Sequence, residues 1–194
     1  MTTSPNRKEE TRRRLLDAAG RSFRANGFAG IGVDGIAQEA GATSGAFYAH
    51  FGSKIGAFDA ALAAGLDEVL ETLPRLQQQN GAEWLRDFAA YYLGTAHRGD
   101  LACGCAMTTL TSEVVRAGED THAIYEAKMT RIAAILADGL TGGSEADRLT
   151  RAWAIISVLT GGLALARAMH TPGTADSIST AIIDAVERLA VSTS

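Results

Sequence analysis

Hydrophobic residues recur along most of this chain with the spacing of one helix face. The first such face consists of Leu15, Leu16, Ala19 and Phe23. Asn26-Gly27 follows this face as a stop signal, and Ser4-Pro5 precedes it as an N-cap with a proline in the first helical position. The pattern predicts a first helix that begins after Ser4 and ends at Asn26.

Two shorter apolar faces come next, and each is too short to form a stable helix alone. The first, just before Gly41, consists of Val33, Ile36, Ala37 and Ala40. The second, after Thr43, contains Phe47 and Phe51. A longer helical pattern then runs from Ser53 to about Gln79, with Pro74 as a bend or stop.

The remaining chain continues in the same helical pattern, with glycine-rich or Pro-Gly joints. We expect helices over 82–97, 104–117, 119–140, 145–170 and 174–191. The sequence has 36 Ala against 7 Val and only three prolines, a balance that favours helix over strand. The expected fold is therefore all-α, with a domain boundary near the start of the Ser53 helix.

Composition limits the class of protein. A chain of 194 residues, 46% of them hydrophobic and 21% charged, suits one domain, or a small domain and a larger one, around a buried core. The longest uncharged stretch, 152–166, is shorter than the roughly 18 residues of a membrane span. The first ten residues are polar, unlike a signal peptide. We expect a soluble cytoplasmic protein with no membrane partner.

Charge is distributed unevenly along the chain. Residues 1–54 carry eight Lys and Arg against five Asp and Glu, a charge of +3, so the remainder of the net −4 places −7 on residues 55–194. A basic end on an acidic body indicates that one end approaches a polyanion. A solvated basic helix face gives the same pattern without any nucleic acid.

Residues 33–51 have the spacing of a helix-turn-helix motif. Ala37 is small where two helices cross, Gly41 follows four residues later where the turn needs positive φ, and Phe47 comes six residues further on as a buried anchor. Thr43 is an N-cap candidate for the second helix. The first turn of that helix would present Ser44, Gly45 and Ala46 to the DNA major groove.

These residues carry a resemblance to a known family. Ile36-Ala37, Ala40-Gly41, Gly45-Ala46-Phe47-Tyr48, His50-Phe51 and Ser53-Lys54 resemble the DNA-binding domain of the TetR family of one-component repressors. The resemblance implies a three-helix DNA-binding domain at 1–54 and a helical effector-binding and dimerisation domain at 55–194. It further implies a homodimeric regulator of double-stranded DNA with a near-palindromic operator, no enzymatic activity and no cofactor.

The resemblance assigns DNA phosphates to Tyr48, His50 and Lys54, and all three side chains are hydrogen-bond donors. The alternative is that Tyr48 and His50 pack between helices and that Lys54 is solvated. Base readout is sparse because no Arg, Lys, Asn or Gln lies between Thr43 and Phe51.

We expect contacts to bases from Ser44, Gly45 and Ala46, and contacts to the minor groove or phosphates from Arg7 or Lys8. Two positions depart from the family pattern. Gly32 follows Ile31 where Thr or Ser usually starts the second helix, and Gly35 replaces a commonly polar residue.

Two cysteines, Cys103 and Cys105, stand at the start of the helix expected over 104–117, where the backbone dipole favours a thiolate. Some TetR-like repressors sense electrophiles through such a cysteine, although a buried cysteine is more often a small hydrophobe. A metal site with His97 or His122 lacks a fixed second pair of ligands, so no metal is expected. A thiol-based redox protein, the alternative from another class, lacks CxxC spacing.

In the body, the candidate effector pocket comprises Trp84, Phe88, Tyr91, Cys103, Cys105, Met107, Tyr125, Met129 and Trp153. The candidate dimer interface comprises Ser157, Thr160, Gly161, Ala164, Ile178, Ile182 and Leu189. The leading function is a repressor released from its operator by a small-molecule or thiol-reactive effector. An activator of the same fold and a purely structural helical dimer stay open as alternatives.

Overall fold

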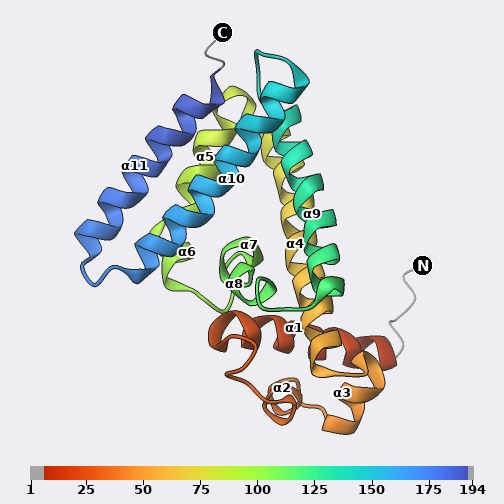
Figure 1. Ribbon diagram of the computed structural model, residues 1–194. Coiled ribbons are helices and arrows are strands. Elements are labelled where there is room, and N and C mark those ends of the chain that lie inside the picture. Colours follow the sequence, from red (N-terminus) through yellow and green to blue (C-terminus); the bar gives the residue numbers. More distant parts are fainter. Residues whose placement is uncertain (1–6, 192–194) are drawn as a thin grey trace.

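The computed structural model describes residues 7–191, and within that range the regular structure is entirely helical (Figure 1). The all-α expectation is confirmed. The helices are α1 (Arg7–Asn26), α2 (Val33–Glu39), α3 (Ser44–Phe51), α4 (Lys54–Asn80), the 3₁₀-helix η1 (Gly81–Glu83), α5 (Trp84–Tyr92), α6 (Thr95–Gly99), α7 (Ala106–Thr109), α8 (Thr111–Val114), α9 (Glu119–Asp138), α10 (Glu145–Ala168) and α11 (Pro172–Ala190). The expected N-cap at Ser4-Pro5 lies outside the described residues.

Helices α1, α2 and α3 form a small unit at one end of the molecule (Figure 1). Its core is made by fully buried apolar side chains on all three helices, namely Leu15, Phe23, Ile36 and Phe47. The Glu39 carboxylate ties α2 to α1, since it accepts hydrogen bonds from Arg21 Nε at 2.9 Å and Ser22 Oγ at 2.7 Å. Helices α2 and α3, with 7 and 8 residues, are too short to be stable in isolation, so their packing on α1 holds the unit together.

Helix α4 joins this unit to the body. Its N-cap is Ser53, whose hydroxyl accepts from Gly56 N at 3.0 Å, and the helix packs against both α1 and α9. Pro74 does not stop the helix, because α4 continues as one helix for six residues beyond it. The expected stop is therefore wrong. Burial of Leu70 and Leu73 against the body stabilises this part of the helix and offsets the hydrogen bond that proline cannot make.

The body consists of two groups of long helices with short helices between them. Figure 1 shows α4 beside α9 and α10 beside α11, with α7 and α8 between the two groups at the end nearest α1. Helices α5 and α10 both pack against α11. The expected helices at 119–140, 145–170 and 174–191 are confirmed with small shifts in their ends.

Two expected helices are instead broken into short pieces. The segment 82–97 is divided into η1, α5 and α6, with the break at Leu93 and Gly94. The segment 104–117 is divided into α7 and α8, with the break at buried Leu110. Leu93 and Leu110 are both buried at these breaks, so tertiary burial overrides the local helical preference.

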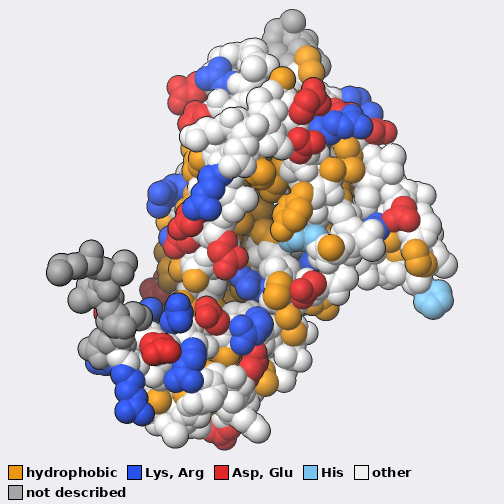
Figure 2. All heavy atoms as spheres, turned by 180° about the vertical axis from the view of Figure 1, so that it is seen from behind, with side chains coloured by type: hydrophobic (Ala, Val, Ile, Leu, Met, Phe, Trp, Pro, Cys, Tyr) orange, Lys and Arg blue, Asp and Glu red, His pale blue; other side chains and the backbone are white. Residues whose placement is uncertain are grey.

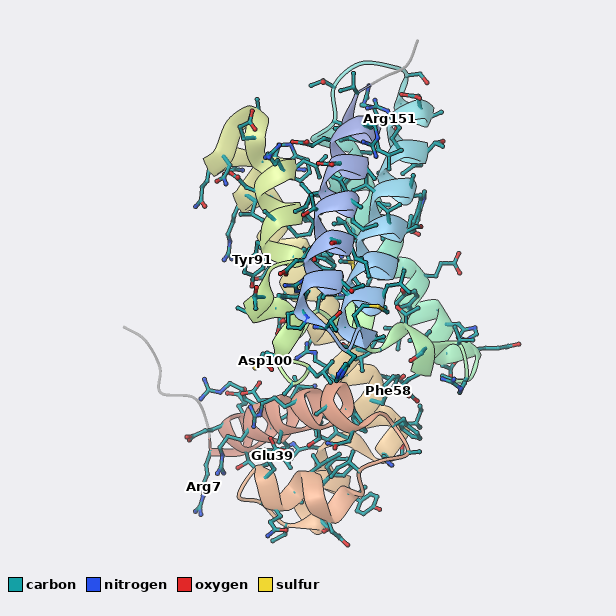
Figure 3. All side chains as sticks on the ribbon, turned by 90° about the vertical axis from the view of Figure 1, so that its left-hand side faces the viewer. Arg7, Glu39, Phe58, Tyr91, Asp100 and Arg151 are labelled. Atoms are coloured by element: carbon teal, nitrogen blue, oxygen red, sulfur yellow. The ribbon has the colours of Figure 1, made fainter. Side chains whose placement is uncertain are left out.

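Helix α10 has the length and apolar composition of a membrane span, and 44% of its most apolar window is buried inside the protein. Its first turns argue for a core helix. Arg151 is buried there, and its guanidinium donates to Asp147 at 2.8 Å and to the carbonyls of Ala190, Thr141 and Gly142 (Figure 3). These bonds fasten α10 to the ends of α9 and α11.

The two adjacent glycines of α10 have different surroundings. A Cβ added to Gly162 would lie 2.5 Å from Ile182 Cγ1 of α11, whereas one added to Gly161 would meet nothing within 4 Å. Ile182 therefore packs against α10 within the chain, while it is only half-buried, and its place in a dimer interface stays a prediction. Ile178 and Leu189 are half-buried. Of the expected interface residues on α10, Ser157, Gly161 and Ala164 are exposed and Thr160 is half-buried.

This difference predicts opposite effects of one substitution at adjacent positions. Gly161→Ala should raise the free energy of unfolding by up to about 1 kcal/mol because alanine favours helix. Gly162→Ala should lower it by about 1 to 2 kcal/mol because the methyl group collides with Ile182. Urea unfolding followed by circular dichroism measures both changes, and equal stabilisation by the two substitutions would contradict the packing described.

Candidate nucleic-acid interface

The turn between α2 and α3 has the geometry that a helix-turn-helix requires. Gly41 adopts φ = +59°, a left-handed conformation that favours glycine. Thr43 caps α3, since its hydroxyl accepts from Ala46 N at 3.2 Å. Ala37 is 2% exposed where the helices cross, and Phe47 is fully buried. The expected roles of these four residues in the fold are confirmed.

The outer face of α3 carries few large side chains. Gly45 and Ala49 are exposed, and 51% of Tyr48 is exposed although its ring contacts Phe47 edge-on at 5.7 Å. The structure therefore does not bury Tyr48 between helices. His50 is half-buried, with its ring centroid 6.4 Å from that of Phe51.

Lys54 occupies the first turn of α4. Its ammonium lies 4.6 Å from the centroid of the Phe28 ring, so an aromatic face holds the cation. The unpaired backbone N–H groups of this turn add positive potential close by. Position and charge both suit an anion, and the contact with Phe28 restricts the movement of the lysine side chain.

Ser44 has a partner that the sequence pattern did not reveal. Its hydroxyl donates a hydrogen bond to Asp34 Oδ1 of α2. The Ser44 oxygen can therefore only accept a further hydrogen bond. At the start of α2, the cap residue Gly32 makes no side-chain hydrogen bond to the helix. The departure from the family pattern therefore removes a hydroxyl from this surface.

Basic side chains extend along α1 beside α3. Arg7, Lys8, Arg12, Arg13 and Arg14 are all exposed, and Arg12 lies over the Phe51 ring at 5.8 Å. Figure 2 shows Lys and Arg side chains gathered over this end of the molecule, and Figure 3 shows Arg7 extending into solvent from the start of α1. Arg12 was missed by sequence reasoning, because its proximity to α3 arises only from the packing of α1 across it.

Comparison with known proteins agrees with this arrangement. Residues 15–61 match the family described as bacterial regulatory proteins, tetR family. The amino-terminal part of the chain is thus similar to the DNA-binding domain of that family. The chain is 46% identical over 56 residues to the HTH-type transcriptional regulator SrpR of Pseudomonas putida, a match that spans 29% of this chain and 26% of SrpR. The match thus spans about a quarter of that relative's length.

Solved structures extend the likeness in fold to nearly the whole chain. A TetR-family regulator from Cytophaga hutchinsonii superposes with a TM-score of 0.81 at 16% identity, covering 98% of this chain and 100% of that one. The reduced form of E. coli NemR superposes with a TM-score of 0.71 at 23% identity, covering 89% and 94%. The TetR arrangement of a helix-turn-helix domain on a helical body is confirmed.

The residues expected to form one effector pocket are divided among three cavities. Met107, Tyr125, Met129 and Trp153 line a cavity of about 640 Å³ between α7, α8, α9 and α10. Phe88, Tyr91, Cys103 and Cys105, again with Met107, line a cavity of about 120 Å³. Trp84 lies apart from both, with its indole N–H donating to Gly139 O at 3.3 Å.

The two thiols lie in a loop before α7, and the expected stabilised thiolate is wrong for both. The Asp100 carboxylate accepts from the Cys103 thiol and raises its pKa, and burial raises the pKa of Cys105. Helix α7 has only four residues, so it provides little dipole at its N-terminus. Both cysteines are therefore thiols at neutral pH.

The histidines weighed as metal ligands already have hydrogen-bond partners. His97 Nε2 accepts from Cys105 N at 3.4 Å, and burial lowers the pKa of His97, so its ring is neutral at pH 7. His122 Nε2 bonds to Val114 O at 2.7 Å. Among residues 7–191 no group of three or more His, Cys, Asp and Glu side chains is placed to hold a metal ion.

The contact between Asp100 and Cys103 predicts a change in thiol reactivity. In a Cys105→Ser background, Asp100→Asn should lower the pKa of Cys103 because it removes the negative charge that disfavours the thiolate. The rate of alkylation by iodoacetamide between pH 7 and 8 should rise severalfold. Asp138→Asn, at an exposed carboxyl at the end of α9, is the control, and equal rates in all three proteins would contradict the assignment.

Proposed function

We propose that this chain is a homodimeric, DNA-binding transcriptional repressor of the cytoplasm, released from its operator by a small-molecule effector. The observation that carries the proposal is the exposed face of α3, which presents small residues and the phenol of Tyr48 on a rigid unit beside a basic helix. The family match over residues 15–61 supports it, since that family is described as bacterial regulatory proteins.

In the proposed complex, the first turn of α3 enters the major groove. Gly45 and Ala46 permit close approach and contact with thymine methyl groups, and the Ser44 oxygen accepts from a base amino group. Tyr48, His50 and Lys54 donate to phosphates on either side of the groove, and Arg7 and Lys8 lie at the edge of the same surface.

A dimer is required for two such helices to reach successive major grooves, about 34 to 36 Å apart. The exposed parts of α10 offer the surface for it. Leu149, Trp153 and Leu165 are 37%, 38% and 57% exposed, unusually high values for large apolar residues on one helix. Trp153 lines the large cavity, so we assign the interface to Leu149 and Leu165 together with the half-buried residues Ile178, Ile182 and Leu189 of α11.

The large cavity and the DNA-binding unit are close to opposite ends of α8. Thr111 and Ser112 line the cavity, while Glu113 and Arg116 line a second hollow against Phe28, in the loop after α1, and against Ile55 and Phe58 at the start of α4. An effector that displaces α8 would therefore shift the contact beside Lys54. To weaken operator binding a hundredfold, it must favour one state by about 2.7 kcal/mol, within ordinary allosteric coupling.

The experiment that tests the function combines genomic DNA capture with a measurement of size. The purified chain should retain a few specific fragments of its own genome and should elute as a dimer. A monomer that retards no fragment at low salt would overturn the proposal. A reporter with the captured site then separates repressor from activator.

The phosphate contacts predict a change in salt dependence. Lys54→Ala should weaken binding to all DNA sequences and reduce the slope of log K against log salt by about 0.9, because one fewer counterion is released. Tyr48→Phe should weaken binding to all sequences with a smaller change in slope. Lys128→Ala, on α9 in the body, is the control and should leave the slope unchanged; an unchanged slope for Lys54→Ala would contradict its role.

The bond between Ser44 and Asp34 predicts an effect on sequence preference. Ser44→Ala should relax the preference at one base pair of each half-site by about 1 kcal/mol without changing the salt slope, since no phosphate contact is lost. Asp34→Asn keeps an acceptor for the hydroxyl, so it should retain the preference. Binding selections on randomised operators measure both, and identical preferences for Ser44→Ala and the parent would exclude Ser44 from readout.

A further inference from the structure

The cavity of about 640 Å³ in the body has the size of a small-molecule site, for which volumes of about 300 to 1,000 Å³ are usual. Helices α7 and α8 form its floor, and α9 and α10 form its walls. Met107, Met129, Ile156 and Trp153 supply apolar and aromatic surface. The polar atoms of the other lining residues decide which class of ligand the cavity prefers.

Several hydroxyl groups on the walls already donate a hydrogen bond to a backbone carbonyl of the protein. Ser157 Oγ donates to Trp153 O at 2.8 Å, and Thr160 Oγ1 donates to Ile156 O at 2.8 Å. Both lie on the α10 wall. Each oxygen can therefore only accept a hydrogen bond from a ligand.

The same holds for the hydroxyl pair at the floor. Thr111 Oγ1 donates to Met107 O, so in the bond of 2.7 Å between Thr111 and Tyr125 the phenol is the donor. Burial raises the pKa of Tyr125, which keeps its phenol protonated. Four hydroxyl oxygens on the walls thus present lone pairs.

Charge on the lining has one sign. Glu126 of α9 is the one ionisable side chain with a formal charge at pH 7 among the lining residues, and it is exposed to solvent at the cavity. The indole N–H of Trp153 is a donor, while the hydroxyls of Ser112 and Thr130 can serve in either sense. An anionic ligand would meet a carboxylate and a series of acceptors.

We propose that this cavity binds an apolar organic cation, a protonated amine on an aromatic or alkyl body. The ammonium group would donate to the oxygens of Ser157 and Thr160, pair with Glu126 and lie near the face of Trp153, while the hydrocarbon covers the methionines. Release of DNA by such a ligand rests on the proposed function. Binding of the ligand to the cavity does not depend on the proposed function.

The test uses three probes that share one hydrocarbon and differ in charge: 4-phenylbutylamine, 4-phenylbutan-1-ol and 4-phenylbutyrate. Titration calorimetry of the full chain should rank the amine tightest and the carboxylate weakest. Glu126→Gln should weaken amine binding about threefold to fivefold, the range for a solvent-exposed ion pair, and leave the alcohol unchanged. Glu119→Gln, on the same helix but outside the cavity, is the matched control and should change neither.

A second variant locates the site. Ala164→Phe places a large side chain in the cavity and should abolish binding of the amine, with circular dichroism and size measurement confirming that the variant is folded. An alcohol or carboxylate that binds as tightly as the amine, an unchanged amine affinity in Glu126→Gln, or an unchanged affinity in folded Ala164→Phe would each overturn the inference.

DNA retardation by the same preparations separates this inference from the proposed function. A chain that retards DNA but shows no preference for the amine removes the ligand class alone. A chain that prefers the amine, loses that preference in Glu126→Gln and retards no DNA supports the ligand class and removes the repressor.

Discussion

The packing of α4 on two partners at once is the constraint on which the rest of the structure depends. The helix begins at Lys54, beside the candidate DNA surface, and continues without a break along α1 and then α9. Because it is continuous, the small amino-terminal unit cannot rotate against the body without repacking α4. The placement of the recognition surface is thus a property of the whole chain, although its residues lie within 1–54.

The same dependence explains why α7 and α8 are short. The sequence pattern predicts one helix over 104–117 in this part of the chain. Two four-residue helices joined at buried Leu110 instead form a floor that contacts the amino-terminal unit on one side and the cavity on the other. Short helices have few internal hydrogen bonds, so this segment depends on its neighbours for stability and is suited to respond to a ligand.

Charge and hydrogen-bond direction divide the molecule by function. The amino-terminal surface carries exposed arginines and donors such as Tyr48, which suit phosphate oxygens. The body cavity carries Glu126 and hydroxyl oxygens whose protons are already used, which suits a donor. The two surfaces thus differ in the direction of the hydrogen bonds that they offer: the amino-terminal surface donates and the cavity accepts.

The sequence by itself determined the all-α class, the long helices, and the helix-turn-helix with its positive-φ glycine, because these follow from local spacing and from the conformational freedom of single residues. It also proposed Tyr48 and Lys54 as phosphate contacts, since their motif lies on one short segment, and that assignment stays a prediction. Tertiary structure alone decided that Gly162 and not Gly161 meets Ile182, that the pocket residues divide among three cavities, and that Asp34 holds Ser44. Those outcomes depend on which faces of distant helices meet, and periodicity shows only that a face is apolar, not which partner buries it.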